Sequence, residues 1–519
     1  MEALQILGCI AATGSVAVAI LSEQRRPLAA GLVVSLVLAA ALLLGEGWDE
    51  LESIRERPAL LVVILLTGAG ALAGLALTLR RRPMLLPLLL IAALPFRIPI
   101  EIRGEDVNLL LPLYAVIGAG ALAALIGAIE RGGKREGSEP RALLLILAAA
   151  IVLYALQSAY SSDVGFATRN IAFFLVPFAA MFVLLSEQEW TPRLLALSLA
   201  VIVGESLLFA LVGVGQHIVG EIFWNPALER SNDFHFYFRV NSLFWDPNIY
   251  GRYLAMASVL LVAVLVWTRE PRRIAAMFAV LGVLLLGLLF AFSQTSFISL
   301  LFGIAVLCAL RWSARWTAIA APVAGVILVA AVILLGGTSE SEDSAREISS
   351  GRTTLIEGGA ELAAEHPLQG HGSASFSEAF IEQEGVAPSK ATVSHNEPIT
   401  VAAEQGVIGI AVYVALIVVS LWALLRGIRA IASGLGAPAD AIGDPAEGGP
   451  GALALARIAL VAAFVALLIH TIGYAGYLTD PLTWALLAVG GALSAAGSSG
   501  NSSISPRSAR LAPPGPAGA

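Results

Sequence analysis

Residues 394–425 read SHNEPITVAAEQGVIGIAVYVALIVVSLWALL, a polar opening followed by an apolar run long enough to cross a bilayer as a helix. A long polar stretch that begins near Gly337 precedes it. Most other polar segments of the chain are short connectors, whereas this one is long enough to fold against the membrane surface and carry a site. His395 stands where the polar stretch meets the apolar run.

Apolar runs of this kind recur along the whole chain. Hydrophobic residues make up 58% of the 519 residues and charged residues 13%, with a mean hydropathy of +0.83. A water-soluble core cannot bury so much apolar surface. The sequence therefore predicts an all-α, polytopic transmembrane bundle of about 12–15 spans, with one long, partly helical extracytoplasmic loop near the C-terminal third. About fifteen apolar runs are centred near Gly14, Ser35, Gly70, Leu90, Gly118, Ile151, Pro177, Val203, Val259, Val283, Gly303, Ile327, Tyr413, Ala463 and Leu486.

Arginine collects in five connectors that fall on one side of the predicted bundle. Because short cytoplasmic loops are enriched in Lys and Arg, we expect this side to face the cytoplasm and the N-terminus to lie outside. The connectors are Arg25-Arg26, Arg80-Arg81-Arg82, Arg131–Arg141, Arg269–Arg273 and Arg311–Arg315. The predicted regions are 1–199, N-terminal transmembrane helices; 200–336, transmembrane helices with an arginine-containing outer loop; 337–396, the extracytoplasmic loop; 397–497, C-terminal transmembrane helices; and 498–519, a disordered tail.

No feature indicates a nucleic-acid partner, a metal or a cofactor. The net charge of -7 is spread over loops of both signs, and the two cysteines lie far apart in apolar runs. His366, His371 and His395 have a spacing that fits no zinc pattern. His217 and His470 lie in apolar runs, where we expect them to be hydrogen-bonded interior groups.

The first candidate site is the segment RVNSLFWDPNIYGR, residues 239–252, at the outer end of a predicted span. A guanidinium group has the permanent charge and fork geometry that suit phosphate oxygens, so Arg239 and Arg252 are candidates to bind a lipid diphosphate, with Asn248 beside them. The alternative is that these arginines and the aromatic residues anchor a span at the membrane interface.

The second candidate is Arg352, in the sequence GRTT that opens a stretch of helix-forming composition ending near Glu365. The sequence HPLQGHG, which ends at Gly372, breaks that stretch. A cation near a helix start does not compensate the helix dipole, so Arg352 needs another explanation. A solvated surface arginine is the alternative.

The third candidate is His395, which helix-start signals surround. Ser394 with Glu397 fits a capping box, Asn396 is the alternative N-cap, and Pro398 suits a first turn. The dipole at a helix N-terminus opposes protonation, so a neutral His395 can accept a proton from a sugar hydroxyl. Backbone N–H groups at the same end favour a phosphate.

Two supporting features follow in the same run. Glu404 is an acidic group inside a predicted span, which requires a partner or a cavity. Gly406 and Gly409 form a small-xx-small pattern that permits close helix packing.

Together these segments resemble the O-antigen ligase and polymerase superfamily of bacterial membrane glycosyltransferases, over roughly 200–424. The matching motifs are residues 239–248, Gly351-Arg352, PLQGHGS at 367–373 with Phe376, SHN at 394–396, EQG at 404–406 and Gly409. The resemblance implies a metal-independent, inverting GT-C type enzyme. It also implies that Arg239 and Arg352 bind the undecaprenyl diphosphate of the donor, and that His395 activates the acceptor hydroxyl.

The chain departs from the family pattern in two respects. Many members have a Ser-Arg pair in the span before the long loop, whereas FSQTSF at 292–297 contains no arginine, and Arg252 is a candidate replacement. The chain also has about three spans more than the family's usual twelve.

We therefore predict an O-antigen ligase-like glycosyltransferase in the cytoplasmic (inner) membrane of a bacterium, with its active site on the extracytoplasmic face. Its expected partners are a lipid-linked glycan donor, membrane lipids and a glycan, lipid or protein acceptor. A surface polysaccharide polymerase of the same superfamily is the nearest alternative. A lipid-linked glycan transporter or flippase would be built from inverted repeats and broken helices, and no repeat is visible.

Overall fold

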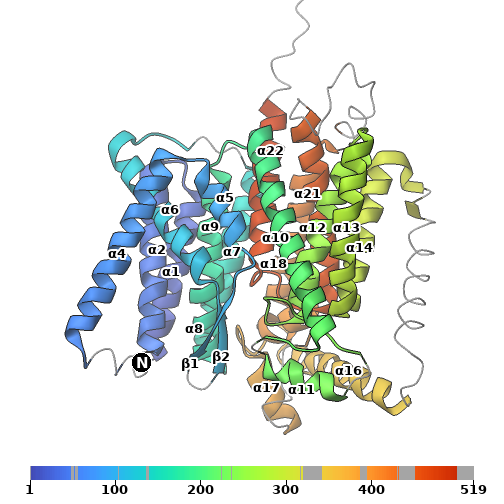
Figure 1. Ribbon diagram of the computed structural model, residues 1–519. Helices are drawn as coiled ribbons and strands as arrows, with labels where there is room; N and C mark the ends of the chain where they lie inside the picture. Colours follow the sequence, from blue (N-terminus) through green and yellow to red (C-terminus); the bar gives the residue numbers. More distant parts are fainter. Residues whose placement is uncertain are drawn as a thin grey trace, which may run out of the picture.

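The computed structural model describes residues 2–47, 52, 56–102, 105–135, 139–223, 225–234, 237–315, 317–318, 342–385, 394–428, 431 and 451–499. The described part is a helical bundle with a cap of short elements at one end (Figure 1). Its helices are α1 Glu2–Leu21, α2 Arg25–Glu46, α4 Pro58–Arg81, α5 Leu85–Ala93, α6 Leu111–Arg131, α7 Arg141–Gln157, α8 Val164–Asn170, α9 Val176–Ser186, α10 Pro192–Val219, α11 Pro226–Phe234, α12 Pro247–Trp267, α13 Pro271–Ala291, α14 Gln294–Cys308, α16 Glu342–Glu365, α17 Phe376–Glu384, α18 Glu397–Leu425, α21 Gly451–Gly473 and α22 Pro481–Ser499. The short helical segments η1 Ser158–Tyr160, η2 Ile171–Leu175 and η3 Ala309–Ser313 extend or join their neighbours.

Twelve helical segments of the described chain are long and apolar enough to cross a membrane, which confirms the predicted polytopic fold. The remaining three of the expected runs differ. The run near Leu90 forms α5, whose nine residues reach only about 14 Å, less than half of a hydrocarbon core. The run near Leu486 forms α22, whose apolar part, Pro481–Ala495, is shorter than the twelve candidate spans. The run near Ile327 lies outside the described residues.

A two-stranded hairpin follows α5 and was not anticipated. β1 Ile98–Ile102 pairs antiparallel with β2 Glu105–Leu109, with Ile98 opposite Leu109. The hairpin runs beside the helices down to the end of the bundle where α11, α16 and α17 lie (Figure 1). The chain therefore completes its passage after α5 as extended backbone.

The two ends of the bundle differ in composition as the arginine pattern predicted. Arg80 and Arg81 end α4 and Arg131 ends α6, at the top of the view in Figure 1. The polar stretch of 337–396 forms α16 and α17 in its described part, and these two helices lie with α11 at the opposite end. The long loop is thus partly helical, as expected.

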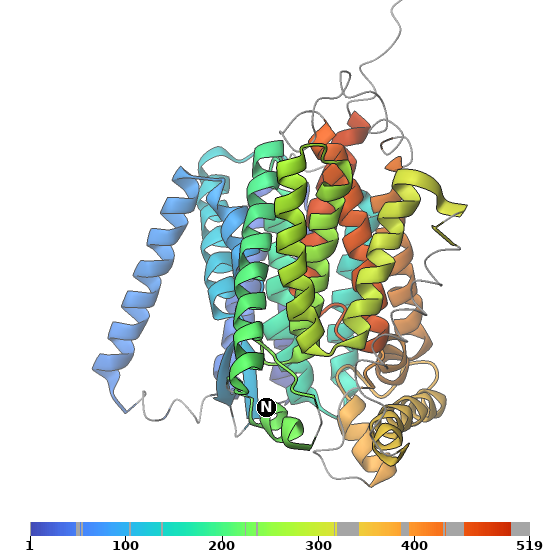
Figure 2. The same ribbon diagram turned by 45° about the vertical axis from the view of Figure 1, so that its right-hand side comes forward.

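The packed centre of the bundle contains α9, α12 and α21. All residues of α9 are buried, and a helix that is apolar on every side belongs in an interior. In contrast, α4 stands at the periphery with only Ala76 and Leu79 buried (Figure 2). Among the helices with candidate site residues, α12, which carries Asn248 and Arg252, is therefore anchored in this buried centre.

Candidate active site

The start of α18 is capped by Asn396. Its side-chain Oδ1 accepts a hydrogen bond from the Ile399 N–H at 3.1 Å, and its Nδ2 donates to the Ile472 carbonyl at 3.0 Å, near the end of α21. Ser394 forms no capping box and instead donates its hydroxyl to the Asn396 carbonyl at 2.7 Å. Of the two predicted caps, Asn396 is therefore confirmed. Pro398 has no N–H group, and the N–H group of Ile399 is already bonded to Asn396. This helix end therefore has fewer free backbone N–H groups to donate to a phosphate than the sequence predicted.

His395 directly precedes this cap, so it lies at a helix N-terminus as predicted. Its backbone φ is +56°, a left-handed conformation that a residue with a side chain keeps only where its surroundings fix it. Asn396 and the buried Ser394 supply that restraint on either side. The half-buried imidazole faces Tyr474, with 5.9 Å between the ring centroids.

The polar loop that follows α16 docks into a break in α18. Gly406 has φ 62° and ψ -161°, which interrupts the helix. The freed backbone groups bond to the loop: the Val407 N–H donates to the Pro367 carbonyl at 2.8 Å, and the Gly372 N–H donates to the Glu404 carbonyl at 2.8 Å. A broken helix would also suit a transporter, but here a segment of the same chain fills the break.

Three glycines permit this docking. Each has a positive φ, and a Cβ at Gly370 would lie 2.3 Å from the backbone of Glu404, while one at Gly372 would lie 2.3 Å from the Cα of Ser161. A Cβ at Gly406 would lie 2.5 Å from the backbone of the docked loop. The expected role of Gly406 in helix-to-helix packing is wrong, because its close neighbour is a loop.

Glu404 holds the same loop through its side chain. Its Oε2 accepts the Ala374 N–H at 2.9 Å and its Oε1 accepts the Phe376 N–H at 3.4 Å. The residue is buried and also lines a cavity. Glu404 therefore has hydrogen-bond partners and also lines a cavity, whereas the sequence required only one of the two.

That cavity, of about 300 Å³, lies between the first turns of α18, the helices α7, α8 and α12, and the segment that joins α21 to α22. Glu397 and Thr400, in the first turn after His395, line it, and so does Tyr474. His395 itself is not one of the lining residues, but its neighbours Glu397 and Tyr474 connect it to the cavity. The charged side chains on its wall are Arg97, Arg252, Glu397, Glu404 and Asp480.

Arg252 is fixed by protein groups on three nitrogens. Its Nη1 forms an ion pair with Asp480, its Nε donates to His470 Nδ1 at 3.0 Å, and its Nη2 donates to the Tyr474 carbonyl at 2.9 Å. Only 2% of the residue is exposed. The proposed binding of a phosphate by Arg252 stays a prediction, and its observed bonds tie α12 to both ends of the α21–α22 connection.

A chain of buried hydrogen bonds continues from Arg252 to Asn248. Because His470 Nδ1 accepts from Arg252, its proton is on Nε2, which donates to Ser296 Oγ at 3.0 Å. Ser296 contacts Ser293 at 2.8 Å, and Ser293 donates to Asn248 Oδ1 at 2.9 Å. His470 is thus the hydrogen-bonded interior histidine that its position predicted, and Asn248 is joined to Arg252 through it.

The structure describes the side chain of one of the other two predicted arginines, Arg239, but not that of Arg352. Arg239 is half-buried between α11 and α12, and its Nε donates to the Ala291 carbonyl at 3.2 Å, next to the connection that carries Ser293. Arg352 belongs to α16, but its side chain is outside the described part of the chain. The implied binding of the donor diphosphate by Arg239 and Arg352 therefore stays a prediction.

Three residues near the site were missed by sequence reasoning. Asp480 precedes Pro481 and an apolar run, and its Oδ1 caps the Leu482 N–H at 2.8 Å, so a helix-start search would have found it. Tyr474 lies one residue beyond α21, and burial first, then the Asp246 carboxylate, raise its pKa, while Arg252 and Arg97 act in the opposite direction. No local signal connects Arg97 with the C-terminal helices.

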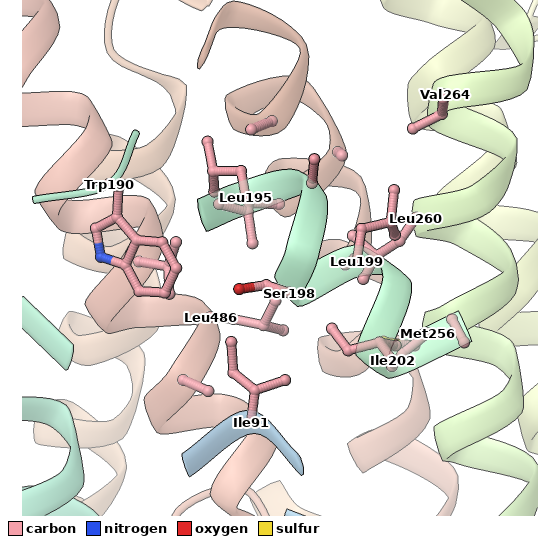
Figure 3. Close-up of a pocket in the computed structure, with 18 of the residues that line it drawn as sticks. Ile91, Trp190, Leu195, Ser198, Leu199, Ile202, Met256, Leu260, Val264 and Leu486 are labelled. Carbon is pink, nitrogen blue, oxygen red and sulfur yellow. The ribbon is translucent and has the colours of Figure 1, made fainter. Parts of the chain in front are cut away.

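A second cavity, of about 220 Å³, lies among α5, α10, α12, α21 and α22 (Figure 3). Its described wall is almost entirely apolar, with Trp190 and Leu195 on one side and Leu260 and Val264 on the other, and it holds no charged side chain. This cavity therefore lacks the charged groups that line the first one. Within the described ranges, no three His, Cys, Asp or Glu side chains are placed to hold a metal ion.

Comparison with known families finds a match in the part of the chain that ends within α18. Residues 279–414 match the sequence model of the O-antigen ligase family. The match extends from α13 into α18 and includes His395, Glu404 and Gly406. A search of curated proteins found no match to the chain. Residues 279–414 therefore form an O-antigen ligase domain, in keeping with the resemblance found in the sequence.

Proposed function

We propose that this membrane enzyme transfers a glycan from an undecaprenyl-diphosphate-linked donor to an acceptor hydroxyl at the outer face of a bacterial cytoplasmic membrane. The observation that carries the proposal is the position of His395. It is held in a strained conformation at the N-terminus of α18, two residues before Glu397, which lines a cavity of about 300 Å³ with charged side chains on its wall. Conformational strain of this kind clusters at functional sites.

The proposed reaction is a single displacement. A neutral His395 accepts the proton of the acceptor hydroxyl as its oxygen forms a bond to the anomeric carbon. The bond from that carbon to the diphosphate oxygen breaks, and undecaprenyl diphosphate leaves with the bonding electrons. Attack from the side opposite to the leaving group inverts the anomeric configuration.

In this mechanism, guanidinium groups carry the charge of the leaving group, so no metal ion takes part. We assign this role to Arg239 and Arg352, with Asn248 and Asn396 holding the substrate. The arrangement at α18 supports a contact by Asn396 only through its position, because both polar atoms of its side chain already bond to the backbone.

The acceptor decides between a ligase and a polymerase. A ligase transfers the glycan to a lipid-anchored core or a protein side chain, whereas a polymerase transfers it to another repeat unit. We favour the ligase, in keeping with the family match, and the polymerase follows if the acceptor is a second donor molecule.

The test uses purified protein in lipid nanodiscs with an undecaprenyl-diphosphate-linked oligosaccharide. Three acceptors are supplied separately: a lipid-anchored core oligosaccharide, a second portion of donor, and an unfolded hydroxyl-rich protein. We expect release of undecaprenyl diphosphate in equal amount to the new glycosidic bond, with inverted configuration by NMR and an unchanged rate in EDTA. In sealed liposomes that contain the purified protein, movement of intact donor across the bilayer without cleavage would support a flippase and contradict the proposal.

A further inference from the structure

Arg97 reaches the cavity from a part of the chain that is remote in sequence from the rest of its charged wall. It lies between the short helix α5 and strand β1. Because α5 covers less than half of the bilayer, the connection that carries Arg97 begins at membrane depth. Non-helical backbone at that depth is tolerated only where protein covers it or where it lines a water-filled cavity.

The side chain of Arg97 is half-buried, and it lines the cavity beside His395. In the described part of the chain it has neither an ion pair nor a hydrogen bond. A cation at membrane depth is costly without a partner. This marks the Arg97 guanidinium as a group built to meet a ligand.

The other charges on the wall are already committed. Arg252 is neutralised by Asp480, the Glu397 carboxylate accepts the Gly476 N–H at 2.5 Å, and Glu404 accepts two loop N–H groups. An anion that enters the cavity would therefore find its available positive charge at Arg97.

Tyr474 locates Arg97 with respect to the proposed base. Both Arg97 and Arg252 act electrostatically on its phenol group, and its ring lies 5.9 Å from that of His395. Arg97 and Tyr474 thus lie on the wall of one cavity, and Tyr474 also packs beside the imidazole of His395. This arrangement suits a leaving group at Arg97 and an acceptor hydroxyl at His395.

We propose that Arg97 binds the diphosphate of the substrate in this cavity and positions it for attack. The inference rests on the proposed function and adds a residue from the N-terminal half of the chain to the site. The fork of the guanidinium can donate two parallel hydrogen bonds to phosphate oxygens.

The experiment measures binding and stability of the purified protein with the variants Arg97→Gln and Arg97→Lys. Arg80→Gln is the control, because Arg80 pairs with the exposed Glu130 at the other end of the bundle. The probes are undecaprenyl diphosphate, undecaprenyl monophosphate and inorganic pyrophosphate, which separate a lipid-linked diphosphate from a free one. Affinity is read from the ligand-induced rise of Tm.

Loss of a charged hydrogen-bonding group should weaken binding of undecaprenyl diphosphate by about ten- to a hundredfold in Arg97→Gln. Arg97→Lys should bind with intermediate affinity, and Arg80→Gln like the wild type. Without ligand, the Tm of Arg97→Gln should equal or exceed that of the wild type, because Arg97 has no ion pair or hydrogen bond to lose within the described residues. The diphosphate preference over the monophosphate should shrink in the same variant.

Three results would overturn the inference. If Arg97→Gln binds undecaprenyl diphosphate as tightly as the wild type, Arg97 does not contact it, while the proposed function stands. If the unliganded Tm falls and the affinity does not, the role of Arg97 is structural. If the wild type itself binds none of the three probes, the proposed function fails together with this inference.

Discussion

Replacement of Gly370 by alanine tests whether docking of the polar loop into α18 holds the site together. Gly370 has φ +68°, and an added Cβ would lie 2.3 Å from the carbonyl carbon and oxygen of Glu404. Backbone atoms cannot move aside as a flexible side chain can. The loop must therefore shift away from the break at Gly406.

Two contributions set the size of the effect. The left-handed conformation costs an alanine about 1–2 kcal/mol. Displacement of the loop further weakens the hydrogen bonds from the His371 and Gly372 N–H groups to α18, each worth about 0.5–1.5 kcal/mol. The free energy of unfolding should fall by about 3 kcal/mol in total.

Gly385 provides a matched control. It has a similar φ of +62°, but a Cβ there would meet nothing within 4 Å. Gly385→Ala should therefore carry the conformational cost alone, about 1–2 kcal/mol. Thermal unfolding in detergent micelles, followed by tryptophan fluorescence, compares the two variants, and glycan transfer is measured on the same samples. Equal decreases of Tm in Gly370→Ala and Gly385→Ala would refute the docking argument.

Two further predictions concern the buried charges of the site. Asp480→Asn leaves the buried Arg252 without its counterion, so the free energy of unfolding should fall by about 3–5 kcal/mol. The double variant Arg252→Met/Asp480→Leu should recover much of this loss, which a thermal melt would show. An unchanged Tm in Asp480→Asn would show that the Arg252–Asp480 ion pair contributes little to stability. Glu404→Met leaves the Ala374 and Phe376 N–H groups unsatisfied, at about 1–3 kcal/mol each, whereas Glu404→Gln keeps one acceptor. Equal Tm values for the two Glu404 variants would contradict the bonding scheme.

Local sequence signals predicted the features that depend on neighbouring residues. Apolar runs gave the spans, arginine clusters gave the two unlike ends of the bundle, and polar residues before an apolar run gave the start of α18 with Asn396 as its cap. Each of these features is fixed within one or two turns of helix. This is why His395 could be located at a helix N-terminus from sequence.

Features with remote causes were not predictable in this way. The break at Gly406 forms because a loop from another segment supplies hydrogen bonds there. The apolar run near Leu90 has the composition of a span, yet its chain continues as the hairpin β1–β2. Arg97, which directly precedes that hairpin, lines the same cavity as Tyr474, and no sequence signature connects the two.

The most direct test of the account is the initial rate of glycan transfer by His395→Ala at saturating donor, compared with the wild type. His371→Ala is the control, because that loop histidine packs against His366 and has no assigned role in the chemistry. Loss of a general base should slow His395→Ala by about 10²–10⁴-fold, with donor binding and Tm preserved and with His371→Ala close to the wild type. Transfer by a folded His395→Ala protein at the wild-type rate would contradict the assignment of His395 as the base.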